Sequence, residues 1–134
     1  MGYTIQGEGF RMKHSPGFEK LADEVRQEIS EIEADAVVKL LKDKTDFKFV
    51  DVREESEWAA GHLPEAVHLS KGIIERDIEE RVPDKLAHIV LYCGGGYRSA
   101  LAAQNLQKMG YTNVRSMIGG YRNWIERKLP LTAR

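Results

Sequence analysis

The fold of this 134-residue chain is decided by the stretch IVLYCGGGYRS, residues 89–99. Its first four residues are apolar and predict a short buried strand, and the three glycines that follow predict a tight loop. Residues 100–109 then carry apolar side chains at helical spacing, which predicts a helix. The only cysteine of the chain, Cys93, stands where the strand enters the loop.

This loop is suited to stabilising a thiolate on Cys93. Unpaired backbone N–H groups and the positive end of the helix dipole attract an anion to the start of a helix. The successive residues Gly94, Gly95 and Gly96 tolerate positive φ, so their amides can turn inward as an anion-binding nest, and Arg98 adds a permanent positive charge.

The energies are large enough for this purpose. Making the thiolate the main form near neutral pH requires a preference of roughly 2.7 kcal/mol. A helix terminus supplies roughly 0.3 to 2 kcal/mol, and each hydrogen bond to an ionised acceptor roughly 1.5 to 3 kcal/mol. A lone cysteine is more often a small buried residue, but the glycines and the arginine favour a nucleophile here.

Composition places the chain among ordinary globular domains. It is 42% hydrophobic and 31% charged with a formal net charge of -1, which gives no bulk attraction to nucleic acid. No stretch predicts a membrane span or a secretory signal, and a single cysteine cannot form an internal disulfide. We therefore expect a cytoplasmic protein with a flexible amino-terminal arm at residues 1–14 and one domain at residues 15–134.

Strands and helices alternate along the chain. Short segments of strand type are predicted at residues 47–52, 66–69, 89–92 and 114–117. Helical spacing predicts helices at residues 15–29, 34–41, 54–60, 73–82 and 100–109, with a last helix opened by Gly119 and Gly120. Such alternation predicts an α/β fold with a mainly parallel sheet covered by helices on both faces. Ligands in such folds bind beyond the carboxyl ends of the strands, where Cys93 is expected.

Other glycine-loop and metal motifs do not fit the sequence. Ser99 stands where a dinucleotide-binding loop needs glycine or alanine, and the loop lacks the Gly-Lys-Ser/Thr of a nucleotide P-loop. Four histidines are scattered and no Cys-x-x-Cys pair exists, so no metal ligand set is expected. The histidines are His14, His62, His68 and His88.

A second group of polar residues follows the strand at residues 47–52. Asp51 and Arg53 lie at its carboxyl end, and Glu57 stands four residues after Arg53. An exposed Arg53–Glu57 pair at this spacing would contribute about 0.2 to 0.5 kcal/mol. Four aromatic residues could wall a pocket, although aromatics at helical spacing usually belong to the core. They are Trp58, Tyr97, Tyr121 and Trp124.

Three segments together resemble rhodanese-like domains. The first is DVREESEWAAGHLPEA at residues 51–66, the second is CGGGYRS at residues 93–99, and the third is GGYRNW at residues 119–124. The resemblance implies a five-stranded parallel sheet flanked by helices, with a persulfide carried on Cys93. It also implies that Asp51, Arg53 and Glu57 brace the loop. The all-glycine loop lacks the extra basic side chain seen in some thiosulfate-using members.

The expected activity is a sulfur transfer through Cys93. An anionic donor such as thiosulfate would leave its outer sulfur on the thiolate, and a small thiophilic acceptor or a protein thiol would remove it. The donor would be held by the loop residues Gly94, Gly95, Gly96, Tyr97, Arg98 and Ser99. No cofactor, metal, nucleic acid or membrane is expected to take part.

Three alternatives remain at this stage. A sulfur carrier would pass its sulfur to another protein, and a non-catalytic module would use the loop for recognition only. A cysteine phosphatase or arsenate reductase would be expected to carry five residues between its cysteine and arginine. Here four residues separate Cys93 from Arg98, which favours the smaller cradle of a sulfurtransferase.

Overall fold

The structure is a computed structural model that describes residues 14–131. The arm expected at residues 1–14 therefore lies outside the described residues, except for His14. Five strands form one sheet in the order β1-β5-β4-β2-β3, and every neighbouring pair is parallel. This confirms the parallel sheet. The strands are β1 (Ser30–Ile32), β2 (Lys48–Asp51), β3 (Val67–His68), β4 (Ile89–Tyr92) and β5 (Val114–Met117).

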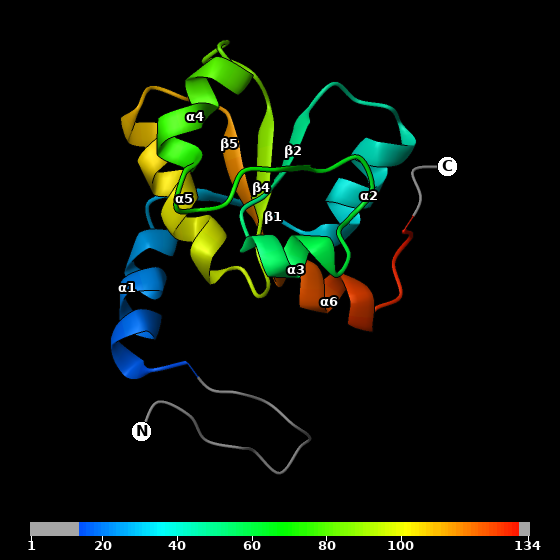
Figure 1. Ribbon diagram of the computed structural model, residues 1–134, viewed down its shortest axis with the longest axis horizontal. Coiled ribbons are helices and arrows are strands. Elements are labelled where there is room, and N and C mark those ends of the chain that lie inside the picture. The colour runs from blue at the N-terminus through cyan, green and yellow to red at the C-terminus, as the bar shows by residue number, and fades with distance from the viewer. Residues whose placement is uncertain (1–13, 132–134) are drawn as a thin grey trace.

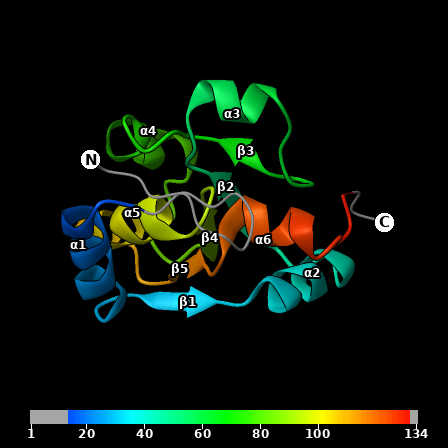
Figure 2. The same ribbon diagram turned by 90° about the horizontal axis from the view of Figure 1, so that it is seen from below.

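Helices cover both faces of the sheet, as expected. One face carries α1, α4 and α5, the other carries α2 and α6, and α3 lies beside the edge strand β3 (Figures 1 and 2). The helices are α1 (Pro16–Arg26), α2 (Ala34–Lys42), α3 (Glu55–Ala59), α4 (Ile74–Arg81), α5 (Tyr97–Lys108) and α6 (Gly120–Glu126). Within residues 14–131, no helix has the length and apolar character needed to cross a membrane.

The central strand β4 divides the core into two clusters. Leu91 and Cys93 belong to the cluster on the side of α4 and α5. Val90 and Tyr92 belong to the cluster on the other side, together with Trp124 of α6. Successive side chains of a strand point to opposite faces, so β4 supplies both cores and is buried along its whole length.

Two element boundaries differ from the sequence prediction by three residues. The helix expected to reach residue 29 ends at Arg26, and residues 30–32 form the edge strand β1 instead. This strand is only three residues long and buries only Ile32, so it carries no apolar run that could reveal it. Helix α5 begins at Tyr97 instead of at residue 100, because residues 97–99 of the predicted loop already form its first turn.

The loop after β4 is attached to the start of α6. The amides of Tyr121 and Arg122 donate hydrogen bonds to the carbonyls of Cys93 (2.7 Å) and Gly94 (3.0 Å). Gly120 allows this close approach, because its φ is +60° and a Cβ there would collide with the Cys93 carbonyl oxygen. The carboxyl end of β4 is thereby brought together with the segment that follows β5.

Candidate active site

Two backbone amides point at the sulfur of Cys93. The amide of Gly96 donates to Sγ over 3.1 Å, and the amide of Ser99 donates to it over 3.3 Å. Gly96 precedes α5 with a φ of +98°, a conformation that glycine adopts without strain. The sulfur therefore lies at the amino-terminal turn of a twelve-residue helix, where hydrogen bonds and the helix dipole both favour negative charge.

The surroundings of the sulfur are partly polar. Cys93 is only 1% exposed and belongs to an apolar cluster. However, the Ser99 hydroxyl lies 3.5 Å from Sγ, and its oxygen lies 2.8 Å from the hydroxyl oxygen of Ser116. Ser116 was not among the sequence candidates; it is a fully buried polar residue of strand β5. The thiol thus accepts hydrogen bonds from two backbone amides and donates one to the Ser99 hydroxyl oxygen.

Arg98 does not contribute an unbalanced charge to the loop. Its guanidinium makes two hydrogen bonds to the carboxylate of Glu57, at 2.8 and 3.1 Å. The hydrogen bond from Arg98 lowers the pKa of Glu57, and the same contact raises the pKa of Arg98. Glu57 therefore fixes Arg98 in place and offsets its charge.

The ion pair that the spacing of Arg53 and Glu57 allowed is not formed. Arg53 instead pairs with Asp51 in a buried two-point ion pair, with an Nη2–Oδ2 distance of 2.8 Å. It also donates to the Gly61 carbonyl and stacks on the ring of Tyr121, 4.1 Å from its centroid. Asp51 is fully buried at the end of β2, whereas Glu57 is partly exposed. Asp51 is therefore the closer and better shielded partner for Arg53.

The four candidate aromatic residues have different environments. Trp124 is fully buried in the core, and Tyr97 packs against the ring of Phe18. Tyr121 lines a pocket. Trp58 stacks between His62 and His68, with ring centroids 3.7 and 5.0 Å away.

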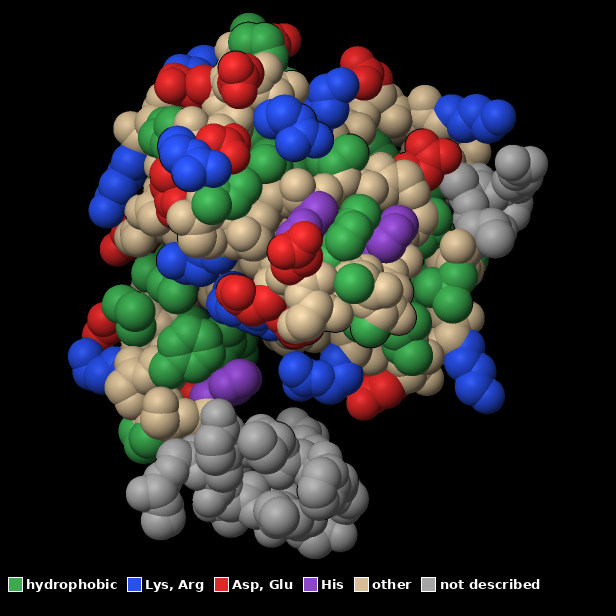
Figure 3. All heavy atoms as spheres, viewed as in Figure 1, with side chains coloured by type: hydrophobic (Ala, Val, Ile, Leu, Met, Phe, Trp, Pro, Cys, Tyr) green, Lys and Arg blue, Asp and Glu red, His purple; other side chains and the backbone are tan. Residues whose placement is uncertain are grey.

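Two of the histidines also make hydrogen bonds to the backbone. A ring nitrogen of His62 lies 3.1 Å from the Leu63 carbonyl oxygen, and one of His68 lies 2.8 Å from that of Arg53. Within residues 14–131, no three histidine, cysteine or acidic side chains lie close enough to hold a metal ion. In the view of Figure 3, acidic and basic side chains are mixed over the surface.

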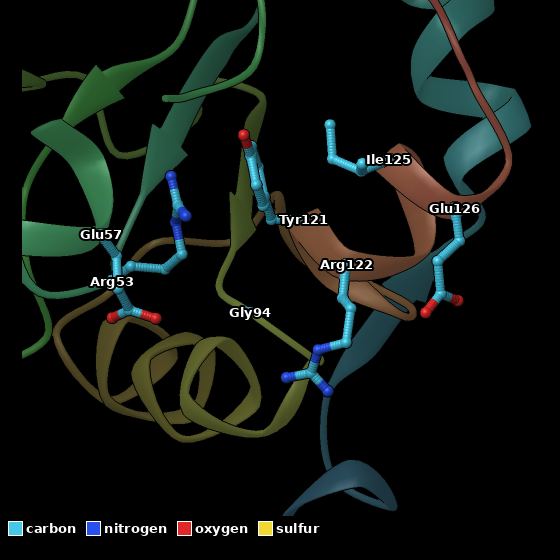
Figure 4. A pocket seen from close by; sticks show the side chains of 7 residues that line it. All are labelled: Arg53, Glu57, Gly94, Tyr121, Arg122, Ile125 and Glu126. Carbon is cyan, nitrogen blue, oxygen red and sulfur yellow. The ribbon is translucent and has the colours of Figure 1, made fainter. Parts of the chain in front are cut away.

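A pocket of about 250 Å³ opens beside the loop. Gly94, the neighbour of Cys93, forms part of its wall, so the pocket reaches the loop one residue from the sulfur. Figure 4 shows its side chains coming from the region after β2, from α3 and from α6. Arg122 was absent from the sequence candidates, although it lies inside the third motif. The lining residues are Arg53, Glu57, Gly94, Tyr121, Arg122, Ile125 and Glu126.

Curated proteins with similar sequences are mostly named for sulfur transfer. A sulfurtransferase of Allochromatium vinosum is 32% identical over 105 residues, which cover 78% of this chain and 96% of that protein. The thiosulfate sulfurtransferase GlpE of Coxiella burnetii is 34% identical over 98 residues, covering 73% of this chain and 86% of GlpE. A putative sulfur carrier protein of Bacillus subtilis, YrkF, is 29% identical over 92% of this chain and 65% of its own length.

Solved structures show the same architecture. The human single-domain sulfurtransferase TSTD1 superposes with a TM-score of 0.65 at 26% identity, covering 72% of this chain and 96% of TSTD1. A Rhodopseudomonas palustris protein, described as of unknown function and a possible tyrosine phosphatase, gives a TM-score of 0.75 at 27% identity. That match covers 92% of this chain and 99% of the other.

The sequence profile of the rhodanese-like domain matches residues 33–127, which is more than half of the chain. This range contains the Cys93 loop, the Arg53–Asp51 and Arg98–Glu57 ion pairs and the pocket. The chain therefore belongs to the rhodanese-like family of sulfurtransferases.

Proposed function

We propose that this protein transfers sulfane sulfur from thiosulfate through a persulfide on Cys93. The observation that supports this most directly is the pair of amides of Gly96 and Ser99 on Sγ at the start of α5. Hydrogen bonds to an ionised acceptor are the strong ones, and they favour the thiolate over the thiol. The same amides can hold the negative charge of a persulfide.

The first half-reaction is a displacement at sulfur. The Cys93 thiolate forms a bond to the outer sulfur of thiosulfate while the S–S bond of thiosulfate breaks, and that bonding pair leaves with sulfite. One singly charged and one doubly charged anion react, and a singly charged persulfide and doubly charged sulfite result. No proton, metal or redox partner is needed for this step.

The second half-reaction returns the enzyme to its starting state. A nucleophile such as cyanide attacks the outer sulfur of the persulfide, the Cys93 S–S bond breaks, and thiocyanate leaves while the thiolate is restored. The loop residues 94–99 surround this chemistry with fixed backbone dipoles, which stabilise charge without reorganising during the reaction. Glu57 positions the loop from outside through its ion pair with Arg98. Asp51 holds Arg53 against the ring of Tyr121, on the α6 segment that is attached to the loop.

A sulfur carrier is the second candidate function, favoured by the similarity to YrkF. A carrier would form the same persulfide but would pass the sulfur to a protein thiol. Two features weaken the phosphatase alternative. Only four residues separate Cys93 from Arg98, which leaves less room for a phosphate. The pairing of Arg98 with Glu57 also leaves less positive charge for it. We also retain the cytoplasm as the proposed location, on the basis of the single cysteine.

The test is incubation with thiosulfate followed by mass measurement of the intact protein. Wild type should gain one sulfur atom and Cys93→Ser should gain none. Many thiocyanate molecules per protein in the presence of cyanide would establish an enzyme. A persulfide that discharges slowly to cyanide but rapidly to a protein thiol would establish a carrier. No sulfur gain, together with hydrolysis of an aryl phosphate, would overturn the proposal.

A further inference from the structure

Arg122 lies against the glycines of the Cys93 loop. Its backbone amide donates to the Gly94 carbonyl, and its guanidinium extends along the loop. A Cβ added at Gly95 would lie 3.5 to 3.8 Å from the guanidinium atoms, and one at Gly94 would lie 3.5 Å from Nη2. A Cβ at either glycine would thus be in ordinary contact with the guanidinium, so the guanidinium lies over the open faces of the two glycines, within the pocket (Figure 4).

The charge of Arg122 is not offset in the way that the charges of the neighbouring arginines are. Arg53 is paired with Asp51, and Arg98 is paired with Glu57. Among the residues from 14 to 131, the structure shows no ion pair for Arg122. Glu126 lies four residues later on α6 and also lines the pocket, but Figure 4 shows the two side chains diverging.

We propose that Arg122 binds the oxyanion end of the sulfur donor, and that the pocket beside Gly94 is the donor site. This inference rests on the proposed function and names a residue that selects the donor. The outer sulfur of thiosulfate must face Cys93 while its oxygens extend away from the sulfur. A guanidinium offers several planar N–H donors to such oxygens. Arg122 thereby provides, from α6, the basic side chain that the all-glycine loop lacks.

The same contact acts through the whole first half-reaction. The negative charge stays on the oxygens of thiosulfate and of the departing sulfite, so Arg122 binds substrate and product alike. Its loss should therefore raise the KM for thiosulfate more than it lowers kcat. Because the arginine is at the surface, the expected effect is about tenfold in KM, at the lower end for a charged hydrogen bond, and high salt should reduce it.

The experiment compares Arg122→Gln, Arg122→Lys and the control Arg127→Gln. Arg127 follows α6, is exposed, pairs with Asp35 and lies outside the pocket. We expect about a tenfold higher KM for thiosulfate in Arg122→Gln, an intermediate value in Arg122→Lys, and less than a twofold change in Arg127→Gln. Discharge of a preformed persulfide to 2-mercaptoethanol, an acceptor without an oxyanion group, should change less than twofold in all three variants.

A binding measurement separates this inference from the proposed reaction. Thiosulfate is titrated into Cys93→Ser and into Cys93→Ser/Arg122→Gln, neither of which can form the persulfide, and binding is followed by calorimetry. Weaker binding to the double variant supports the donor site even if wild type gains no sulfur. Equal binding, or an unchanged KM in Arg122→Gln while wild type still forms the persulfide, overturns the role of Arg122 and leaves the reaction standing.

Discussion

Arg98 and Glu57 form a two-point ion pair between residues 41 positions apart, with N–O distances of 2.8 and 3.1 Å. The pair joins α3 to the first turn of α5, the turn whose amides face Cys93. Glu57 also accepts a hydrogen bond from the amide of Glu54, which fixes the carboxylate from its own helix. The carboxylate is thus held on both sides, and we propose that it braces the loop.

The first prediction concerns the pH dependence of this brace. The hydrogen bond from Arg98 lowers the pKa of Glu57 below its ordinary value of 4.5. A carboxyl group with a lowered pKa stabilises the fold above the unfolded-state pKa, and the stability is lost as pH falls through the folded-state pKa. Glu57→Gln should therefore be less stable than wild type at neutral pH, by no more than about 1 kcal/mol because the pair is partly exposed.

Below pH 4.5 this difference should shrink and then vanish, because wild type loses the ion pair by protonation of Glu57. Urea unfolding of both proteins across this range measures it. Glu55→Gln, which removes an exposed carboxylate from the same helix, serves as the control and should run parallel to wild type. A gap between wild type and Glu57→Gln that stays constant into acid would show that Glu57 acts by packing alone.

The second prediction concerns the buried pair of Asp51 and Arg53. Their side chains are 0% and 4% exposed, so removing one partner leaves an uncompensated charge inside the protein. Asp51→Ala should lower the free energy of unfolding by about 3 to 5 kcal/mol. Asp35→Ala, which breaks the exposed pair with Arg127, should cost no more than about 1 kcal/mol.

Urea denaturation measures both costs. If Asp51→Ala alone does not fold, Asp51→Ala/Arg53→Leu should recover part of the stability, because it removes the orphaned charge as well. An equal loss of unfolding free energy in Asp51→Ala and Asp35→Ala would contradict the view that burial makes the Asp51–Arg53 pair costly to break.

The elements found in the sequence are those whose patterns are local. The inner strands β4 and β5 have the predicted bounds. For β4 the signal is local, because a run of apolar residues marks a strand that is covered on both faces. Strand β1 was missed since it exists only through its pairing with β5. Its existence depends on a partner more than eighty residues away, and the sequence supplied no local sign of it.

In the site, too, the sequence revealed the features with a local pattern and not those that depend on how distant segments meet. The glycine loop and the cysteine were visible in the sequence, and the amides do face the sulfur. The ion-pair partners were not visible, because spacing along a helix suggested Arg53 with Glu57. Arg53 instead pairs with Asp51, two residues earlier at the strand end, and Glu57 pairs with the distant Arg98. Arg122 was overlooked for a related reason, since its nearness to the glycines arises only when α6 docks on the loop.

The third prediction concerns the hydroxyl beside the sulfur. Ser99→Ala keeps the amide that donates to Cys93 but removes the hydroxyl 3.5 Å from Sγ, and it leaves the Ser116 hydroxyl without this partner. We expect persulfide formation to slow by about two- to tenfold, the range of one neutral hydrogen bond. Ser116→Ala should slow it less, because the hydroxyl of Ser99 stays in place. Single-turnover mass measurement follows both variants, and a larger effect for Ser116→Ala would contradict this order.

The fourth prediction concerns Gly120, where α6 meets the loop. Gly120→Ala forces a side chain into the Cys93 carbonyl and the backbone of Gly94, at a φ of +60°. The positive φ alone costs about 1 to 2 kcal/mol, and the collision must also push the loop away from α6. We therefore expect a stability loss larger than this and a large fall in persulfide formation.

The matched control for this variant is Gly17→Ala in α1, where an added Cβ meets nothing within 4 Å. Alanine in a helix is more stable than glycine, so this variant should keep its activity and gain up to about 1 kcal/mol. Thermal unfolding and the rate of persulfide formation distinguish the two substitutions. Normal persulfide formation in Gly120→Ala would mean that the sulfur and its amides hold their arrangement without the contact between α6 and the loop, so that the amino-terminal turn of α5 alone shapes the site.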